Sequence, residues 1–160
     1  MSVAVGEAVS VQQQDFDVGA EIAALGAAAS EVGAVASFVG LVRGSAEGSA
    51  VSGMTLEHYP GMTGRALEEI VTAALGRWPL LGVRVIHRVG PLRTGERIVF
   101  VGVASAHRGA AFEACEYIMD YLKTRAPFWK REDTADGGRW VDARDSDEAC
   151  VERWAQGGSA

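Results

Sequence analysis

The chain has 160 residues, of which 48% are hydrophobic and 22% are charged, and its formal net charge is −6. This composition excludes a disordered chain, and the acidic balance argues against a broad nucleic-acid-binding surface. No apolar run reaches the ~18 residues of a membrane span, and the two cysteines lack the spacing of a zinc site or a disulfide framework. We therefore expect a cytoplasmic protein with no metal and no cofactor.

The first elements are expected to be short. Residues 1–14, with their polar Gln run, are interpreted as a flexible lead-in, and residues 15–154 as a single domain. Asp17 is a candidate N-cap for an Ala-rich helix. Residues 32–43 predict a buried strand that ends at Arg43, and the Gly, Ser and Ala content of residues 44–53 predicts a mobile loop.

The middle of the chain predicts alternating strands and one long helix. Residues 54–59 form an expected strand, and the apolar residues that follow recur at helical spacing until Pro79 ends the helix. Residues 82–89 alternate as in a strand with one buried face. After a turn at residues 91–96, the apolar run 97–104 predicts a central strand.

A second helix is expected from about Gly109 to Thr124, because Pro127 disfavours helical geometry at the residue before it. Lys123 then ends this helix, and Lys130 follows the break. After Lys130, the sequence predicts a short strand (140–144), a helix (145–154) capped by Asp145 or Ser146, and a frayed tail (155–160).

Lysine is scarce in this chain. Only Lys123 and Lys130 are present beside thirteen arginines, and both lie in the segment DYLKTRAPFWKRE. Where Arg supplies nearly all the positive charge, an ammonium indicates a compact, titratable donor or nucleophile. The alternative is that two solvated lysines are neighbours by chance.

An anion site is indicated where the central strand meets the second helix. His107 and Arg108 lie there, and the N–H groups and dipole of a helix N-terminus favour an anion. Alternatively, His107 packs against the sheet edge and Arg108 pairs with an acid such as Glu113. A helix of about 14 residues spans ~21 Å, so His107 and Lys123 of one chain could lie too far apart for one small ligand. A symmetric dimer or a curved chain would each bring them together.

Other side chains extend the candidate site. Crowding by cations would lower the pKa of Lys123, and Arg43 and Arg144 are further candidates for phosphate contacts. His58 and His87 are interpreted as structural. The absence of GxGxxG, Walker, GxSxG and HExxH motifs leaves anion-directed acid/base or acyl chemistry.

Seven segments, in order between about residues 33 and 154, resemble the family of large, catalytic subunits of molybdopterin synthase: FVGLVR, LEHYPGM, RWPL, VIHRVG, GERIVFVGVASAHR, FEACEYIMDYLKTRAPFWKRE and RWVDAR. The resemblance implies an α+β fold of the α/β-hammerhead type with an additional antiparallel β subdomain. It also implies a homodimer within a heterotetramer, with a small ubiquitin-like sulfur-carrier subunit at each end.

The implied reaction converts cyclic pyranopterin monophosphate (precursor Z) into molybdopterin, with sulfur delivered as a thiocarboxylate on the carrier's C-terminal glycine. By this resemblance, Lys123 stabilises the thiocarboxylate and acyl intermediates, and Lys130 contacts the substrate and assists proton transfer or opening of the cyclic phosphate. The implied substrate-binding residues are Arg43, His107, Arg108, Arg131, Glu132 and Arg144. Leu41 departs from the basic or polar residue that many relatives carry there.

Two other functions remain open from the sequence. The same cations could form a non-catalytic receptor that holds the tail of a ubiquitin-like carrier. They could also form a phosphate-ligand sensor that ignores any carrier.

Overall fold

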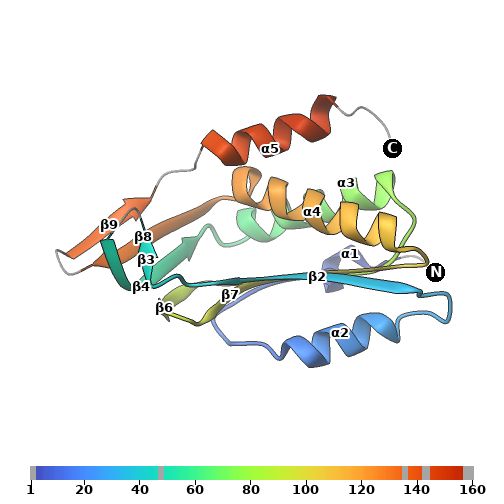
Figure 1. The fold of residues 1–160 in the computed structure, drawn as a ribbon, viewed down its shortest axis with the longest axis horizontal. Coiled ribbons are helices and arrows are strands. Elements are labelled where there is room, and N and C mark those ends of the chain that lie inside the picture. Colours follow the sequence, from blue (N-terminus) through green and yellow to red (C-terminus); the bar gives the residue numbers. More distant parts are fainter. Residues whose placement is uncertain (1–2, 47–48, 135–136, 142–144, 157–160) are drawn as a thin grey trace.

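A computed structural model describes residues 3–46, 49–134, 137–141 and 145–156 (Figure 1). The helices are α1 (Val5–Ala8), α2 (Val18–Gly26), α3 (Met62–Arg77), α4 (Arg108–Arg125) and α5 (Asp145–Gln156). The strands are β1 (Val9–Gln12), β2 (Ala34–Leu41), β3 (Ser45–Ala46), β4 (Ser49–His58), β5 (Leu80–Arg88), β6 (Gly90–Arg93), β7 (Arg97–Ser105), β8 (Phe128–Thr134) and β9 (Gly137–Val141). None of the helices in the described residues is long and apolar enough to cross a membrane.

The main sheet has the strand order β1-β5-β7-β2, with β1 parallel to β5 and the other pairs antiparallel. Helices cover both of its faces: α2 lies on one, and α3 and α4 lie on the other beneath α5 (Figure 1). Leu25 of α2 packs with Ile86 and Phe100 in a core on the α2 side. The prediction of a single buried face for residues 82–89 is therefore wrong, because α2 buries the second face of β5.

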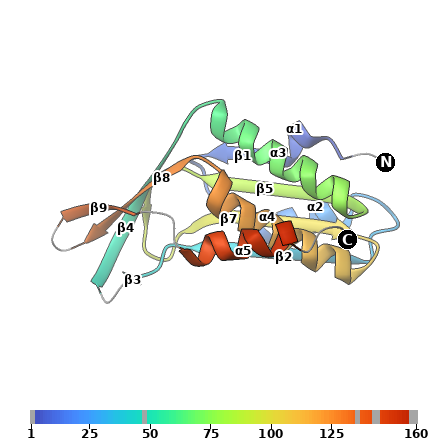
Figure 2. The same ribbon diagram turned by 90° about the horizontal axis from the view of Figure 1, so that it is seen from above.

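The second sheet lies at one end of the molecule, beyond the ends of α3 and α4 (Figure 2). Its strand order is β3-β4-β8-β9, and β6 also pairs with β4. Part of the loop expected at residues 44–53 is strand, β6 occupies part of the turn expected at residues 91–96, and β8 is a strand that the sequence did not predict. These strands form because β4 offers partners on both sides, with His58 opposite Phe128 and Leu56 opposite both Lys130 and Gly90.

The interpretation of residues 1–14 as a loosely held lead-in is wrong for residues 5–12. These residues form α1 and β1, and Val9 pairs with Val85 of β5 at the edge of the main sheet. Ala8 is buried in the larger core. The chain is held because β1 supplies the backbone hydrogen bonds of an otherwise open strand edge.

The expected helices form close to their predicted limits. The Asp17 carboxylate caps α2 by accepting a hydrogen bond from the Ala20 N–H at 2.9 Å. Helix α3 ends before Trp78, and α5 runs two residues past its expected end into the segment 155–160. The predicted strand at residues 140–144 is described only at Trp140 and Val141, where it belongs to β9.

The break after α4 is confirmed and turns the chain into β8. Ala126 has extended geometry (φ −85°, ψ 129°), as expected for a residue before proline. The buried Thr63 hydroxyl donates a hydrogen bond to the Pro127 carbonyl at 2.8 Å and accepts one from the Tyr59 N–H. This hydroxyl fixes the turn between α4 and β8 against the start of α3.

Candidate active site at the junction of the two sheets

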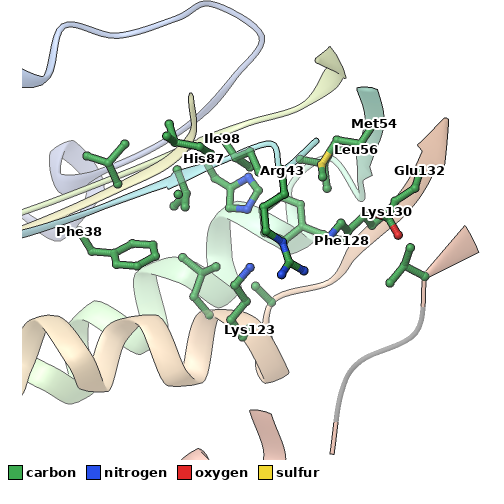
Figure 3. Close-up of a pocket in the computed structure, with 17 residues that line it drawn as sticks. Phe38, Arg43, Met54, Leu56, His87, Ile98, Lys123, Phe128, Lys130 and Glu132 are labelled. Carbon is green, nitrogen blue, oxygen red and sulfur yellow. The ribbon is translucent and has the colours of Figure 1, made fainter. Parts of the chain in front are cut away.

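A cavity of about 590 Å³ lies where the main sheet, the C-terminal end of α4 and the second sheet meet (Figure 3). This volume is typical of small-molecule sites. Its lining consists of Phe38, Val39, Gly40, Leu41, Arg43, Met54, Leu56, His87, Ile98, Val99, Leu122, Lys123, Ala126, Phe128, Lys130, Glu132 and Val141.

Both lysines line this cavity. Lys123 is exposed in the last turn of α4, and Lys130 is half-buried on β8. Side chains alternate along a strand, so Phe128, Lys130 and the buried Glu132 share the face of β8 that lines the cavity. The turn after α4 thus returns the second ammonium to the site that holds the first.

Arg43 supplies a third cation from the segment after β2. The Val42 N–H donates to the Glu96 carbonyl at 2.9 Å, and the Val42 carbonyl accepts from the Gly95 N–H at 2.8 Å. These two bonds fix the backbone directly before Arg43. In Figure 3 the Arg43 guanidinium and the Lys123 amine both project into the cavity.

Arg131 lies outside the cavity, on the opposite face of β8. Its guanidinium packs over Gly138, where a Cβ atom would overlap it. Trp129 shares this outer face and contacts Tyr59 and Trp140, with ring centroids 6.0 and 6.1 Å apart. Strand alternation therefore separates Arg131 from Lys130 and Glu132. The other predicted arginine, Arg144, lies outside the described residues.

His107 and Arg108 lie at the far end of α4 from the cavity. His107 is the N-cap residue, but its side chain makes no capping hydrogen bond, and both side chains are exposed. At 1.5 Å per residue, the helix separates His107 from Lys123 by ~24 Å. Within a single chain, the predicted anion site at the start of α4 therefore lies far from the lysines.

His87 lines the cavity although the sequence favoured a structural role for it. His87 is 6% exposed, and its ring stacks on Phe128, with centroids 3.8 Å apart and an interplanar angle of 20°. Burial lowers the pKa of His87 to about 4 against the opposing effect of its hydrogen bond to the Arg88 backbone, and the charges of Lys123 and His58 also lower it. The strand periodicity at residues 82–89 already placed His87 with buried valines, but it gave no sign of a cavity there.

The cavity joins an apolar wall to its cations. Phe38, Leu41, Ile98 and Phe128 supply much of the apolar surface, and Leu41 remains 52% exposed. A flat ring can pack against such a wall while an attached anion reaches the ammonium and guanidinium groups.

The described residues provide no activated thiol in this region. Both cysteines are free, and burial followed by the nearby charge of Glu116 raises the pKa of Cys115 to about 11. Its thiol donates a hydrogen bond to the Val101 carbonyl at 3.7 Å. A protonated, buried thiol is a poor nucleophile. Within the described part of the chain, no group of three or more His, Cys, Asp or Glu side chains could hold a metal ion.

The sequence model of the MoaE protein family matches residues 11–125. The chain belongs to the MoaE family. A molybdopterin synthase catalytic subunit of Ralstonia nicotianae is 62% identical to this MoaE protein over 146 residues, which cover 91% of this chain and 83% of the relative. A protein of the same name from Pseudomonas aeruginosa is 58% identical over 149 residues, covering 93% of this chain and 99% of the relative.

The fold of this MoaE protein is also similar to a solved structure. The molybdopterin biosynthesis MoaE protein of Burkholderia ambifaria superposes with a TM-score of 0.79 at 52% identity, covering 92% of this chain and 97% of that one. The predicted α+β fold with a second antiparallel sheet is confirmed by this likeness and by the two sheets described above.

Proposed function

We propose that the chain is the catalytic subunit of a molybdopterin synthase, and that it transfers sulfur from a carrier thiocarboxylate to precursor Z. The main support is the cavity that joins Lys123, Lys130 and Arg43 to an apolar wall. Relatives named molybdopterin synthase catalytic subunit, at up to 62% identity, support the same reaction.

In this proposal, the cavity binds a phosphorylated ring and a sulfur-bearing chain end together. Arg43 contacts the phosphate through its planar guanidinium, and the ring packs on the apolar wall. The Lys123 ammonium stabilises the thiocarboxylate and the negative charge that develops on acyl intermediates. Lys130, beside Glu132 on the same face of β8, assists proton transfer to the substrate.

The proposed sulfur donor is the C-terminal thiocarboxylate of a small ubiquitin-like carrier subunit. The name "catalytic subunit" of the relatives implies a second component. An external donor also agrees with the raised pKa of the buried Cys115 thiol, which leaves that sulfur protonated. Neither cysteine is among the residues that line the cavity, and we assign no sulfur-transfer step to either.

We further propose that His107 and Arg108 complete the site of a second copy of the chain. Both are exposed and ~22 to ~24 Å from their own Lys123, so they can serve a phosphate beside the lysines only from a partner protomer. In a two-fold dimer, each protomer would supply His107 and Arg108 to the cavity of its partner. Two such dimerised chains with two carriers give the heterotetramer.

Subunit mixing tests this arrangement. We expect Lys123→Ala and Arg108→Ala homodimers to be nearly inactive, whereas a doubly tagged heterodimer of the two should recover about half the wild-type activity. One of its sites carries both substitutions and the other carries neither. If both groups came from one chain, each site of the heterodimer would carry one defect and activity would stay at the homodimer level.

Reconstitution with purified components tests the reaction. We expect molybdopterin to form when the wild-type chain, thiocarboxylated carrier and precursor Z are combined, and not when the carrier ends in an ordinary carboxylate. The product is measured after oxidation to a fluorescent pterin. Tight carrier binding without turnover would favour the receptor, and binding of the phosphorylated pterin without the carrier's participation would favour the sensor.

A further inference from the structure

His87 is a titratable cavity-lining residue that the proposed function does not use and that the sequence did not predict as a site residue. Its position is tightly defined. The ring is held from one side by the stack on Phe128, and its Nδ1 atom lies 2.9 Å from the backbone carbonyl of Arg88. Two different contacts therefore fix both the plane and the rotation of this imidazole.

The contact with Arg88 also determines which nitrogen carries the proton. A carbonyl oxygen can only accept a hydrogen bond, so Nδ1 must be the N–H donor. In the neutral ring, Nε2 then has a lone pair and can only accept. The ring lines a cavity whose charged side chains, apart from Glu132, are hydrogen-bond donors.

The charged groups around His87 come from each element at the cavity. Lys123 of α4 and His58 of β4 act electrostatically on the ring, and Arg43 after β2 and Lys130 and Glu132 of β8 line the same cavity. The Arg88 side chain points elsewhere, since it bonds the carbonyls of Gln13 and Arg97 and the Glu96 carboxylate. Lys123 and His58 both favour the neutral imidazole, and Figure 3 shows the Lys123 amine directed toward the region of the His87 ring.

We propose that His87 is a positioning residue for Lys123: its Nε2 lone pair accepts a hydrogen bond from the ammonium, keeps that amine charged and directs it into the cavity. The role depends on the function proposed above, since it concerns the same cavity. A neutral acceptor suits this task, because it orients a cation without cancelling the charge that the substrate phosphate and the thiocarboxylate require.

The pKa of the Lys123 amine measures this contact directly. A hydrogen bond to the ammonium favours the charged form, so its removal should lower the pKa of Lys123 by about one unit. The chain has only two lysines, so ¹³Cε-lysine labelling gives two signals, and Lys130→Arg assigns them. The titration uses the full chain and needs no substrate.

Three substitutions separate the acceptor from the rest of the ring. His87→Phe keeps a ring to stack on Phe128 and removes both nitrogens. His87→Asn keeps a donor near the Arg88 carbonyl but removes the acceptor at Nε2 together with the ring, whereas His87→Gln, also without the ring, restores an oxygen near the Nε2 position. We expect the pKa of Lys123 to fall in the Phe and Asn variants and to stay near the wild-type value in the Gln variant.

The activity assay provides a second test of the role of His87. In the Phe and Asn variants, kcat should fall roughly tenfold with little change in KM for precursor Z, and the alkaline limb of the pH profile should move to lower pH. The Gln variant should recover most of the rate. An unchanged Lys123 titration in folded Phe and Asn variants would overturn the role of His87, even if the wild type makes molybdopterin. Conversely, a shifted titration in a chain that makes no molybdopterin would contradict only the proposed function.

Discussion

Lys123→Ala should reduce molybdopterin formation by about 10²- to 10³-fold, the loss typical when one group that stabilises developing negative charge is removed. The other cations of the cavity cannot take its place, since Lys130 and Arg43 approach from β8 and from the segment after β2. The effect should appear in kcat when carrier and precursor Z are saturating. Single-turnover assays with thiocarboxylated carrier measure it directly.

Arg125→Ala is the matched control for this substitution. Arg125 lies two residues further along the same helix, is exposed, and places a guanidinium nitrogen 3.5 Å from Glu148 rather than in the cavity. It should leave the rate near the wild-type value. Lys123→Ala should also leave the melting temperature nearly unchanged, because the site is exposed and alanine favours the helix. A wild-type rate in folded Lys123→Ala would remove Lys123 from the mechanism.

The buried His87 should make the fold sensitive to mild acid. Its pKa is about 4 in the folded chain against an ordinary value of 6.5, so the unfolded chain binds more protons between these values. The resulting stability is complete above pH 6.5 and is lost as the pH falls toward 4. The shift corresponds to about 3 kcal/mol at most.

Urea unfolding at several pH values, in the wild type and in His87→Phe, measures this contribution. The free energy of unfolding should fall less steeply between pH 6.5 and 4 in the variant, which has no imidazole to protonate. Two carboxyl groups also have lowered pKa values: Asp15, which accepts hydrogen bonds from Arg97, and Glu96, which accepts one from the Arg93 N–H. Their contributions to the stability of the fold are also lost in acid. They are present in both chains, so their effect cancels in the difference. Parallel curves would show that His87 protonates in the folded state as it does in the unfolded one.

The helices were predictable because their signals are local. The apolar spacing before Pro79 predicted α3, and Pro127 predicted the end of α4 within a few residues. Each signal depends on residues within a few positions of one another, so no distant contact is needed to interpret it.

Strand β8 was missed because its signal is not local. Residues 128–134 alternate Phe, Lys and Glu on one face with Trp, Arg and Asp on the other, and neither face is uniformly apolar. The segment is a strand because β4 pairs with it across seventy or more residues of sequence. That pairing brings Lys130 and Glu132 to the cavity and turns Arg131 away. Their closeness in sequence could not show which of these side chains face the cavity.

The sequence by itself determined the family, the principal helices and the break at Ala126, because these follow from local spacing and from ordered motifs, and it predicted a role for the rare lysines. The tertiary structure alone decided which side chains share the cavity. It placed His87 beside Lys123 and left His107 at the other end of α4. The physical reason is that strand pairing and helix length fix where a side chain lies, and both depend on contacts between residues far apart in the chain.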